Sequence, residues 1–189
     1  AEAVVPDLMH FVLYTMDSDN SRKELLTVSK KAHFFKNLVI KFVEWMQKPY
    51  LQAITDTKFG TFSKISEMRK LVDGIVSTGN IAGEGWFLSA EMLELIHTGV
   101  TNIVCMQPFA CLPNHVTGKG IIGELRRRNP LSNIVAVDFD PGASEVNQVN
   151  RIKLMLSQAF KNLEFTEKVE FAQLKVETKY PDFENVKNN

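Results

Sequence analysis

The chain has 189 residues, 44% of them hydrophobic, and its 22 lysines and arginines balance 22 aspartates and glutamates. A chain of this length can bury one core, or one core and a helical subdomain. Its neutral charge favours no nucleic-acid partner, no apolar stretch reaches the roughly 20 residues that span a bilayer, and the N-terminus lacks the features of a signal peptide, so we expect a cytoplasmic protein without a membrane partner.

The first eighty residues are predicted to be mostly helical. Apolar residues follow helical spacing from Ser21 to about Gln47, and we expect the one or two helices there to end before Pro49. Ser63 is a suitable cap for a further helix that runs to Val76.

The sequence changes character at Gly83. An apolar helix is predicted from about Phe87 to His97, and Gly99 stands where a helix ends in a left-handed turn. Trp86, which lies between glycines and this helix, is expected to anchor packing rather than to bind a ligand.

Two short apolar runs rich in branched residues, Asn102–Met106 and Asn133–Asp138, are predicted to be buried strands. The segment from Gly118 to Arg128 between them has helical spacing, so the order is strand, helix, strand. This order indicates a right-handed crossover with parallel strands. We therefore predict an α/β fold: a small parallel sheet in a Rossmann-like three-layer arrangement, with a mostly helical N-terminal part.

A last clear helix is predicted from Glu145 to about Phe160. These patterns divide the chain into a helical layer or subdomain at 1–82, an α/β core at 83–162 and a C-terminal extension at 163–189, whose last residues are expected to fray. Because the chain begins at Ala1 without methionine, we expect either processing or a fragment of a longer polypeptide.

The segment Cys105–Lys119 combines unusual residue types after the first strand. It holds both cysteines of the chain together with His115, Asn114 and a lysine, and we expect Pro108 and Pro113 to exclude regular helix there. Polar groups on a loop whose conformation is restricted by prolines are typical of a functional site.

Each of these residues has an alternative interpretation. Cys111 is either a thiolate ligand or nucleophile, or a small buried hydrophobe, whereas core packing is favoured for Cys105. His115 either binds metal or moves protons, or bonds to backbone. Two thiols and one histidine fill neither a zinc site nor an iron–sulfur site, so any cluster needs ligands from outside.

Other candidates have ordinary explanations. Lys119 at a helix start resembles the end of a phosphate-binding loop, but the glycine and hydroxyl positions of that loop are not filled. Asp138 and Asp140 fit turn chemistry better than a cation site. The three arginines Arg126–Arg128 suit a solvated helix end. The loop that holds Cys111 follows the first predicted strand, and the loop that holds Asp140 follows the second. Because the strands are expected to be parallel, we expect Cys111 and Asp140 to face one cleft.

Three strings carry a resemblance to a known family: GEGWFLSAEM at Gly83–Met92, CMQPFACLPNHVTGKG at Cys105–Gly120, and VDFDPGASEVNQVNRIKLM at Val137–Met155. They resemble the acyl-CoA dehydratase activase-related family, which is similar to the activator of 2-hydroxyglutaryl-CoA dehydratase. The resemblance covers about Gly83 to Phe160 and corresponds to the final region of the long activases. Alanine stands at Ala110, where the family more usually has glycine.

The resemblance implies a system in which ATP hydrolysis drives an electron through iron–sulfur clusters toward radical dehydration of a 2-hydroxyacyl-CoA. It implies that Cys111 is the metal ligand of a cluster, expected to be [4Fe–4S] and incomplete in this chain, and that Asn114, His115 and Lys119 lie in the same cofactor-binding site. ATP would bind elsewhere in the full-length protein. The implied partners are other domains of the same polypeptide, a dehydratase-like redox protein and an acyl-CoA.

Two functional hypotheses follow. The first is a redox module, inactive alone, that contributes Cys111 to an iron–sulfur site. The second is a non-catalytic docking or scaffold domain that binds a partner or an acyl-CoA. A hydrolase that uses Cys111 and His115 is a weaker third hypothesis, because no orienting acid is evident nearby.

Overall fold

The computed structural model describes residues 3–25, 30–55 and 63–179. Within these ranges the elements are α1 Leu8–Leu25, α2 Lys30–Thr55, α3 Ile65–Leu71, α4 Gly85–His97, β1 Asn102–Pro108, α5 Ile122–Arg128, β2 Asn133–Phe139 and α6 Glu145–Lys179. A π-helical turn at Asn114–Gly118 and a 3₁₀ turn at Lys119–Ile121 join β1 to α5.

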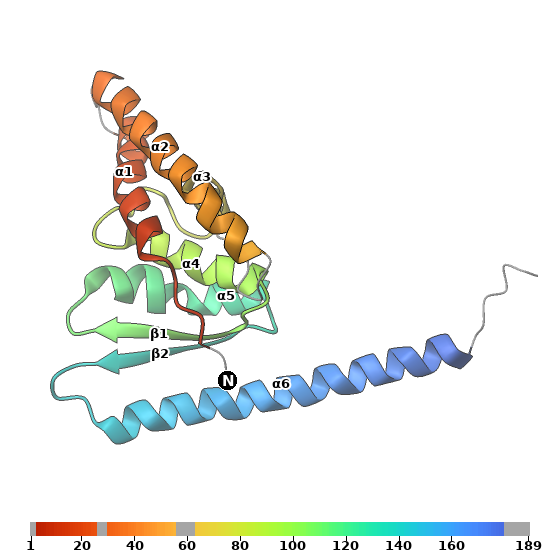
Figure 1. The fold of residues 1–189 in the computed structure, drawn as a ribbon. Helices are drawn as coiled ribbons and strands as arrows, with labels where there is room; N and C mark the ends of the chain where they lie inside the picture. Colours follow the sequence, from red (N-terminus) through yellow and green to blue (C-terminus); the bar gives the residue numbers. More distant parts are fainter. Residues whose placement is uncertain (1–2, 26–29, 56–62, 180–189) are drawn as a thin grey trace, which may run out of the picture.

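The two strands form a parallel sheet, which confirms the predicted α/β class. Their register runs from Asn102 opposite Asn133 to Pro108 opposite Phe139. Figure 1 shows the sheet between the helical part of the molecule and the long helix α6. Since parallel strands end at the same edge, the loops after β1 and β2 are neighbours.

One hydrophobic core joins the N-terminal helices to the α/β part. Trp86 is fully buried, its ring meets that of Tyr14 edge to face at 5.2 Å, and Tyr14 also stacks on Phe87 at 5.2 Å. Aromatic side chains in these arrangements contribute strongly to core packing. The prediction that Trp86 anchors packing is confirmed.

The N-terminal helices differ from their predicted limits. Helix α1 begins at Leu8, before the predicted region, and α2 passes through Pro49 instead of ending before it. Pro49 is exposed, so water can satisfy the carbonyl group that the proline leaves without a helical partner. Helix α3 ends at Leu71 rather than at Val76, and Lys64, not Ser63, is its cap.

Helix α6 is much longer than predicted. It runs to Lys179 instead of ending near Phe160, and Figure 1 shows its far part extending away from the rest of the molecule. The proposed boundary after residue 162 therefore falls inside a continuous helix, and residues 180–189 lie outside the described residues. Within the described ranges, neither α6 nor any other helix has both the length and the apolar character needed to cross a membrane.

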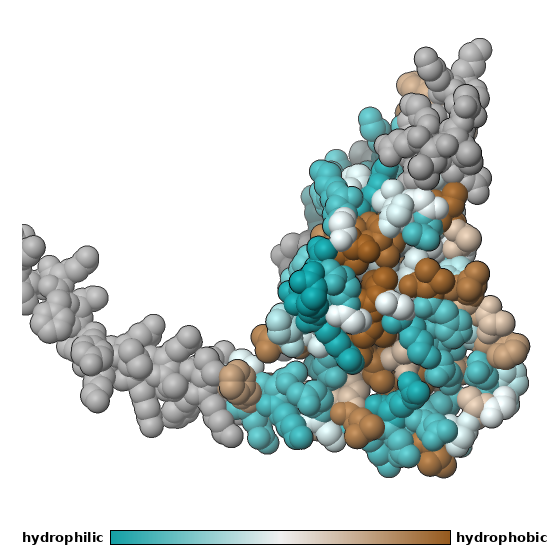
Figure 2. Space-filling model, turned by 180° about the vertical axis from the view of Figure 1, so that it is seen from behind, coloured by the Kyte–Doolittle hydropathy of each residue, from teal (hydrophilic) through white to brown (hydrophobic). Residues whose placement is uncertain are grey.

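The helical part leaves apolar side chains on the surface. On the described part of α2 the exposed large apolar residues are Phe34, Phe35, Leu38, Phe42, Trp45, Met46 and Tyr50. Figure 2, drawn from the opposite side, shows further apolar side chains in a band over the upper, helical part, flanked by hydrophilic residues. A large exposed apolar area is typical of a surface that contacts other macromolecules.

Candidate functional site

The candidate site lies where the two parallel strands end. The segment that holds Cys111 follows β1, and the segment that holds Asp140 follows β2. In open α/β sheets, ligands bind in the crevice outside the carboxyl ends of the strands.

Cys111 is a half-buried free thiol held by its own loop. The side-chain amide of Asn114, itself buried, donates a hydrogen bond to Cys111 Sγ at 3.1 Å. The Cys111 N–H donates to the Pro108 carbonyl, and the His115 N–H donates to the Cys111 carbonyl, each at 3.2 Å. Sequence and structure thus bring Cys111 and Asn114 together, with the sulfur in a fixed place near the surface.

The local backbone explains the shape of this loop. Ala110 has φ of 53°, in the left-handed region that favours glycine, so the chain turns sharply just before Cys111. The expectation that Pro113 excludes helix is wrong, because a helical turn starts at Leu112 and a proline in a first turn has no N–H to leave unpaired. The loop is therefore a tight turn followed by a helical one.

Buried hydrogen bonds attach the π-helical turn to α4. Ser89 Oγ donates to the Thr117 carbonyl at 2.6 Å, and Thr117 Oγ1 donates to the Pro113 carbonyl at 2.8 Å. Ser89 and Thr117 are both buried, and the bond between them is shielded from water, whereas the Thr117–Pro113 bond is partly buried. They fix the segment that follows Cys111.

Cys105 belongs to the core, as predicted. Its thiol is buried, and the Gln107 amide donates to Sγ at 3.1 Å. Burial is the main cause that raises the pKa of the Cys105 thiol, opposed by the Gln107 hydrogen bond, and the charge of Glu91 raises it further. A buried thiol with a raised pKa is unreactive.

Glu91 is a perturbed group that the sequence interpretation missed. Burial raises the pKa of Glu91 to about 8, with smaller contributions from the charges of Glu94 and Glu84. The signal was present, since these glutamates follow helical spacing on an otherwise apolar helix. Near neutral pH the Glu91 side chain is therefore mainly uncharged.

His115 and Lys119 lie at the rim of the loop. Both are exposed, and the His115 ring has no side-chain hydrogen bond within the part of the chain that the structure describes. Lys119 Nζ lies 3.5 Å from Asp138 Oδ1. This ion pair links the loop after β1 to the end of β2.

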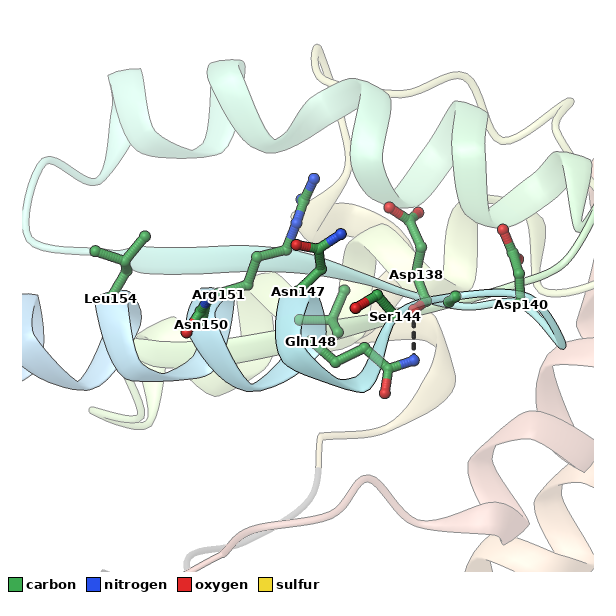
Figure 3. Close-up of a pocket in the computed structure, with 10 residues that line it drawn as sticks. Asp138, Asp140, Ser144, Asn147, Gln148, Asn150, Arg151 and Leu154 are labelled. Atoms are coloured by element: carbon green, nitrogen blue, oxygen red, sulfur yellow. Dashed lines mark hydrogen bonds between the residues drawn. The ribbon is translucent and has the colours of Figure 1, made fainter.

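A polar groove of about 460 Å³ lies beside the end of β2. Figure 3 shows its residues between β2 and the first turns of α6. Most of the lining side chains are polar or charged: Asp138, Asp140, Ser144, Asn147, Gln148, Asn150 and Arg151. The Ala143 N–H donates to the Asp140 carbonyl at 2.9 Å, which confirms the predicted turn.

The two loops share an edge and an ion pair, but they do not share this groove. Its lining contains no residue of the Cys111 loop. Leu112, Pro113 and Thr117 instead line a separate pocket against the segment Gly79–Ala82. The expected common cleft is thus divided into two.

The residues present fit one corner of an iron–sulfur cluster and no more. A [4Fe–4S] cluster takes four cysteine thiolates, and Cys111 is one accessible thiol on a fixed loop. Within residues 3–25, 30–55 and 63–179, no group of three or more histidine, cysteine, aspartate or glutamate side chains is placed to hold a metal ion. The remaining ligands would have to come from other polypeptide segments.

Comparison with protein-family models, with curated proteins and with solved structures finds no match for this chain.

Proposed function

We propose that this chain is the C-terminal domain of an ATP-coupled, CoA-substrate-specific enzyme activase, and that it contributes Cys111 to an iron–sulfur electron-transfer site. The observation that carries the proposal is the half-buried Cys111 sulfur, held by Asn114 at the carboxyl end of a parallel sheet. The strings around Gly83, Cys105 and Val137 add the family resemblance. In this proposal the protein is cytoplasmic and its sheet is part of a Rossmann-like three-layer domain.

Each residue of the loop has a role in this proposal. Cys111 is the metal ligand, and the Asn114 amide, which donates to its sulfur, tunes the reduction potential, since hydrogen bonds to cluster sulfurs shift it. When bound, the cluster would supply one-electron transfer. His115 and Lys119 place polar groups at the exposed rim, where a cofactor or a partner arrives.

The domain is not active alone in this proposal. ATP binds to other domains of the same polypeptide, and the electron passes to a dehydratase-like redox partner that acts on an acyl-CoA. These parts supply the remaining cluster ligands, because the described residues provide a single accessible thiolate.

A second candidate function is a non-catalytic docking or scaffold domain. The same lack of a multi-ligand group among the described residues favours it, as do the exposed apolar side chains of α2. In this alternative the Cys111 loop is structural, and the domain binds a partner or part of an acyl-CoA.

Iron and acid-labile sulfide content distinguishes the two functions. The polypeptide that contains this chain is purified without oxygen, and Cys111→Ser is compared with Cys105→Ala, which removes the buried thiol. We expect Cys111→Ser to lose most of the iron and sulfide of its cluster and Cys105→Ala to keep them. Equal content in all three proteins would contradict the redox proposal and favour the docking domain.

A further inference from the structure

The two outer edges of the sheet differ in how their backbone groups are satisfied. The Asn133 N–H donates to the Thr101 carbonyl at 2.8 Å, so residue 133 points its backbone groups toward β1. Backbone groups alternate in direction along a parallel strand. Ile134, Ala136 and Asp138 therefore point theirs away from β1, toward the outer edge of β2.

Side chains from the flanking helices cap this outer edge of β2. Arg126 of α5 lies exposed at the helix end, as expected for the Arg126–Arg128 run, and also donates to the Ile134 carbonyl. From α6, Arg151 donates to the Ala136 carbonyl and Gln148 to the Asp138 carbonyl, each at 2.9 Å. Figure 3 shows Arg151 and Gln148 beside the strand, with the Gln148 bond dashed. Capped carbonyls cannot pair readily with another strand.

Among the described residues, no helix side chain caps the outer edge of β1, where the Met106 carbonyl accepts only a long bond of 3.5 Å from the neighbouring Gln107 amide. By the same alternation Asn102, Val104 and Met106 point their backbone groups outward. In the part of the chain that the structure describes, the N–H and carbonyl of Val104 and the N–H of Met106 have no hydrogen-bond partner. Unpaired N–H and carbonyl groups along a strand edge can bind an extended polypeptide segment as an added strand.

The side chains of this edge are accessible as well. Val104 is 37% exposed and Met106 is 58% exposed, whereas Val137 on β2 is fully buried. Helix α6 packs mainly along β2, so it leaves the β1 half of that face uncovered. Helix α6 therefore does not cover the side chains that would lie next to those of an added strand.

We propose that a second copy of this chain docks on the β1 edge. The two β1 strands run antiparallel about a two-fold axis, and the sheet becomes four-stranded in the order β2-β1-β1-β2. The segment Asn102–Pro108 contains no charged residue, so two copies meet without repulsion. A two-fold interface needs a self-complementary surface, and a strand edge that offers both donors and acceptors is one.

The alternation of backbone groups limits the registers to those in which outward-pointing residues face one another. We choose the register with Val104 opposite Val104 and Asn102 opposite Met106, because it pairs all three outward-pointing residues and gives about six hydrogen bonds between the copies. One strand pair is a small interface, so we expect a dissociation constant on the order of micromolar. The proposal does not depend on metal binding by Cys111.

Sedimentation velocity over a concentration series tests the dimer. The wild-type chain is expected to sediment as a dimer at high concentration, and Met106→Pro is expected to remain a monomer. Proline there removes an outward N–H and leaves the hydrogen bonds to β2 in place. Val104→Lys, which places two lysines directly opposite each other, is also expected to be monomeric and covers the case in which the proline variant does not fold. Leu131→Lys, at a similarly exposed position away from the edge, should still dimerise.

A disulfide tests the register. In a Cys111→Ser background, Val104→Cys is expected to form an intermolecular bond between the two residues 104, found by mass spectrometry of the linked peptide, because opposed residues bring their Cα atoms within disulfide range. A monomer at every concentration, or unchanged association in Val104→Lys, would overturn the proposal. The iron content of Cys111→Ser tests only the proposed function, and sedimentation tests only the dimer. Failure of one proposal can therefore be distinguished from failure of the other.

Discussion

The segment after β1 and the segment after β2 stand at the same edge of one sheet, but they are built differently. After β1 the chain packs a π-helical turn against α4 through the buried residues Ser89 and Thr117, beside the half-buried Glu91. After β2 an open turn borders a polar groove whose lining includes Asp138 and Arg151. One segment holds a half-buried thiol in a fixed place against buried hydrogen bonds, whereas the other offers solvated polar groups. Position at a sheet edge alone therefore does not determine what a loop can do.

The largest expected effect concerns Glu91 on α4. Its folded-state pKa of about 8 lies above the ordinary value of 4.5, so the folded chain holds a proton that the unfolded chain releases between these pH values. Stability should therefore fall as pH rises from about 4.5 to 8. Glu91→Gln should remove this slope and stabilise the protein at pH 9 by on the order of 3 kcal/mol.

Urea unfolding at pH 5, 7 and 9 measures this effect. Asp140→Asn, in the loop after β2, is the matched control and should keep the wild-type slope. If Glu91→Gln keeps the wild-type pH dependence, burial does not raise the pKa of the Glu91 carboxyl group as expected.

The next effect concerns the glycines of the two segments. A Cβ atom at Gly118 would lie 2.9 Å from Leu88 Cδ2 and 3.2 Å from Cys105 Sγ, whereas one at Gly142 would meet nothing within 4 Å. Overpacking of this kind typically costs about 1–3 kcal/mol, so Gly118→Ala should lower the free energy of unfolding by that amount. Gly142→Ala should change it little. Chemical denaturation of both variants compares them directly, and equal stabilities would remove the distinction between the two loops.

The smallest effect concerns the ion pair that joins the segments. Lys119 and Asp138 are both partly exposed, so Lys119→Gln should cost less than about 1 kcal/mol, and the loss should vanish in high salt. Thermal melting at low and high salt checks this expectation. A loss that persists in high salt would mean that Lys119 stabilises the loop through packing of its side chain rather than through the ion pair with Asp138.

Sequence patterns predicted the elements whose apolar spacing is strong. The α/β class, the parallel strands starting at Asn102 and Asn133, and the left-handed turn at Gly99, which has φ of 91°, were all predicted and are confirmed. Burial of Cys105 followed from its place within an apolar run. These features depend on local composition, which the sequence displays directly.

Features that depend on tertiary contacts were not predicted. Helix α1 has little amphipathic pattern, and its buried residues, such as Tyr14, become visible only through their contacts with α4. The pKa of Glu91 depends on neighbours brought by folding. Whether two loops share a groove depends on side-chain packing between strands and helices, which residue spacing along one strand does not specify.

Helix α6 is long compared with the sheet that it packs against. It starts beside the carboxyl ends of the strands and runs back past their beginnings (Figure 1). At 1.5 Å per residue it measures about 50 Å, longer than the sheet on which it rests. The end of the helix at Lys179 therefore lies well away from the sheet edge that carries Cys111.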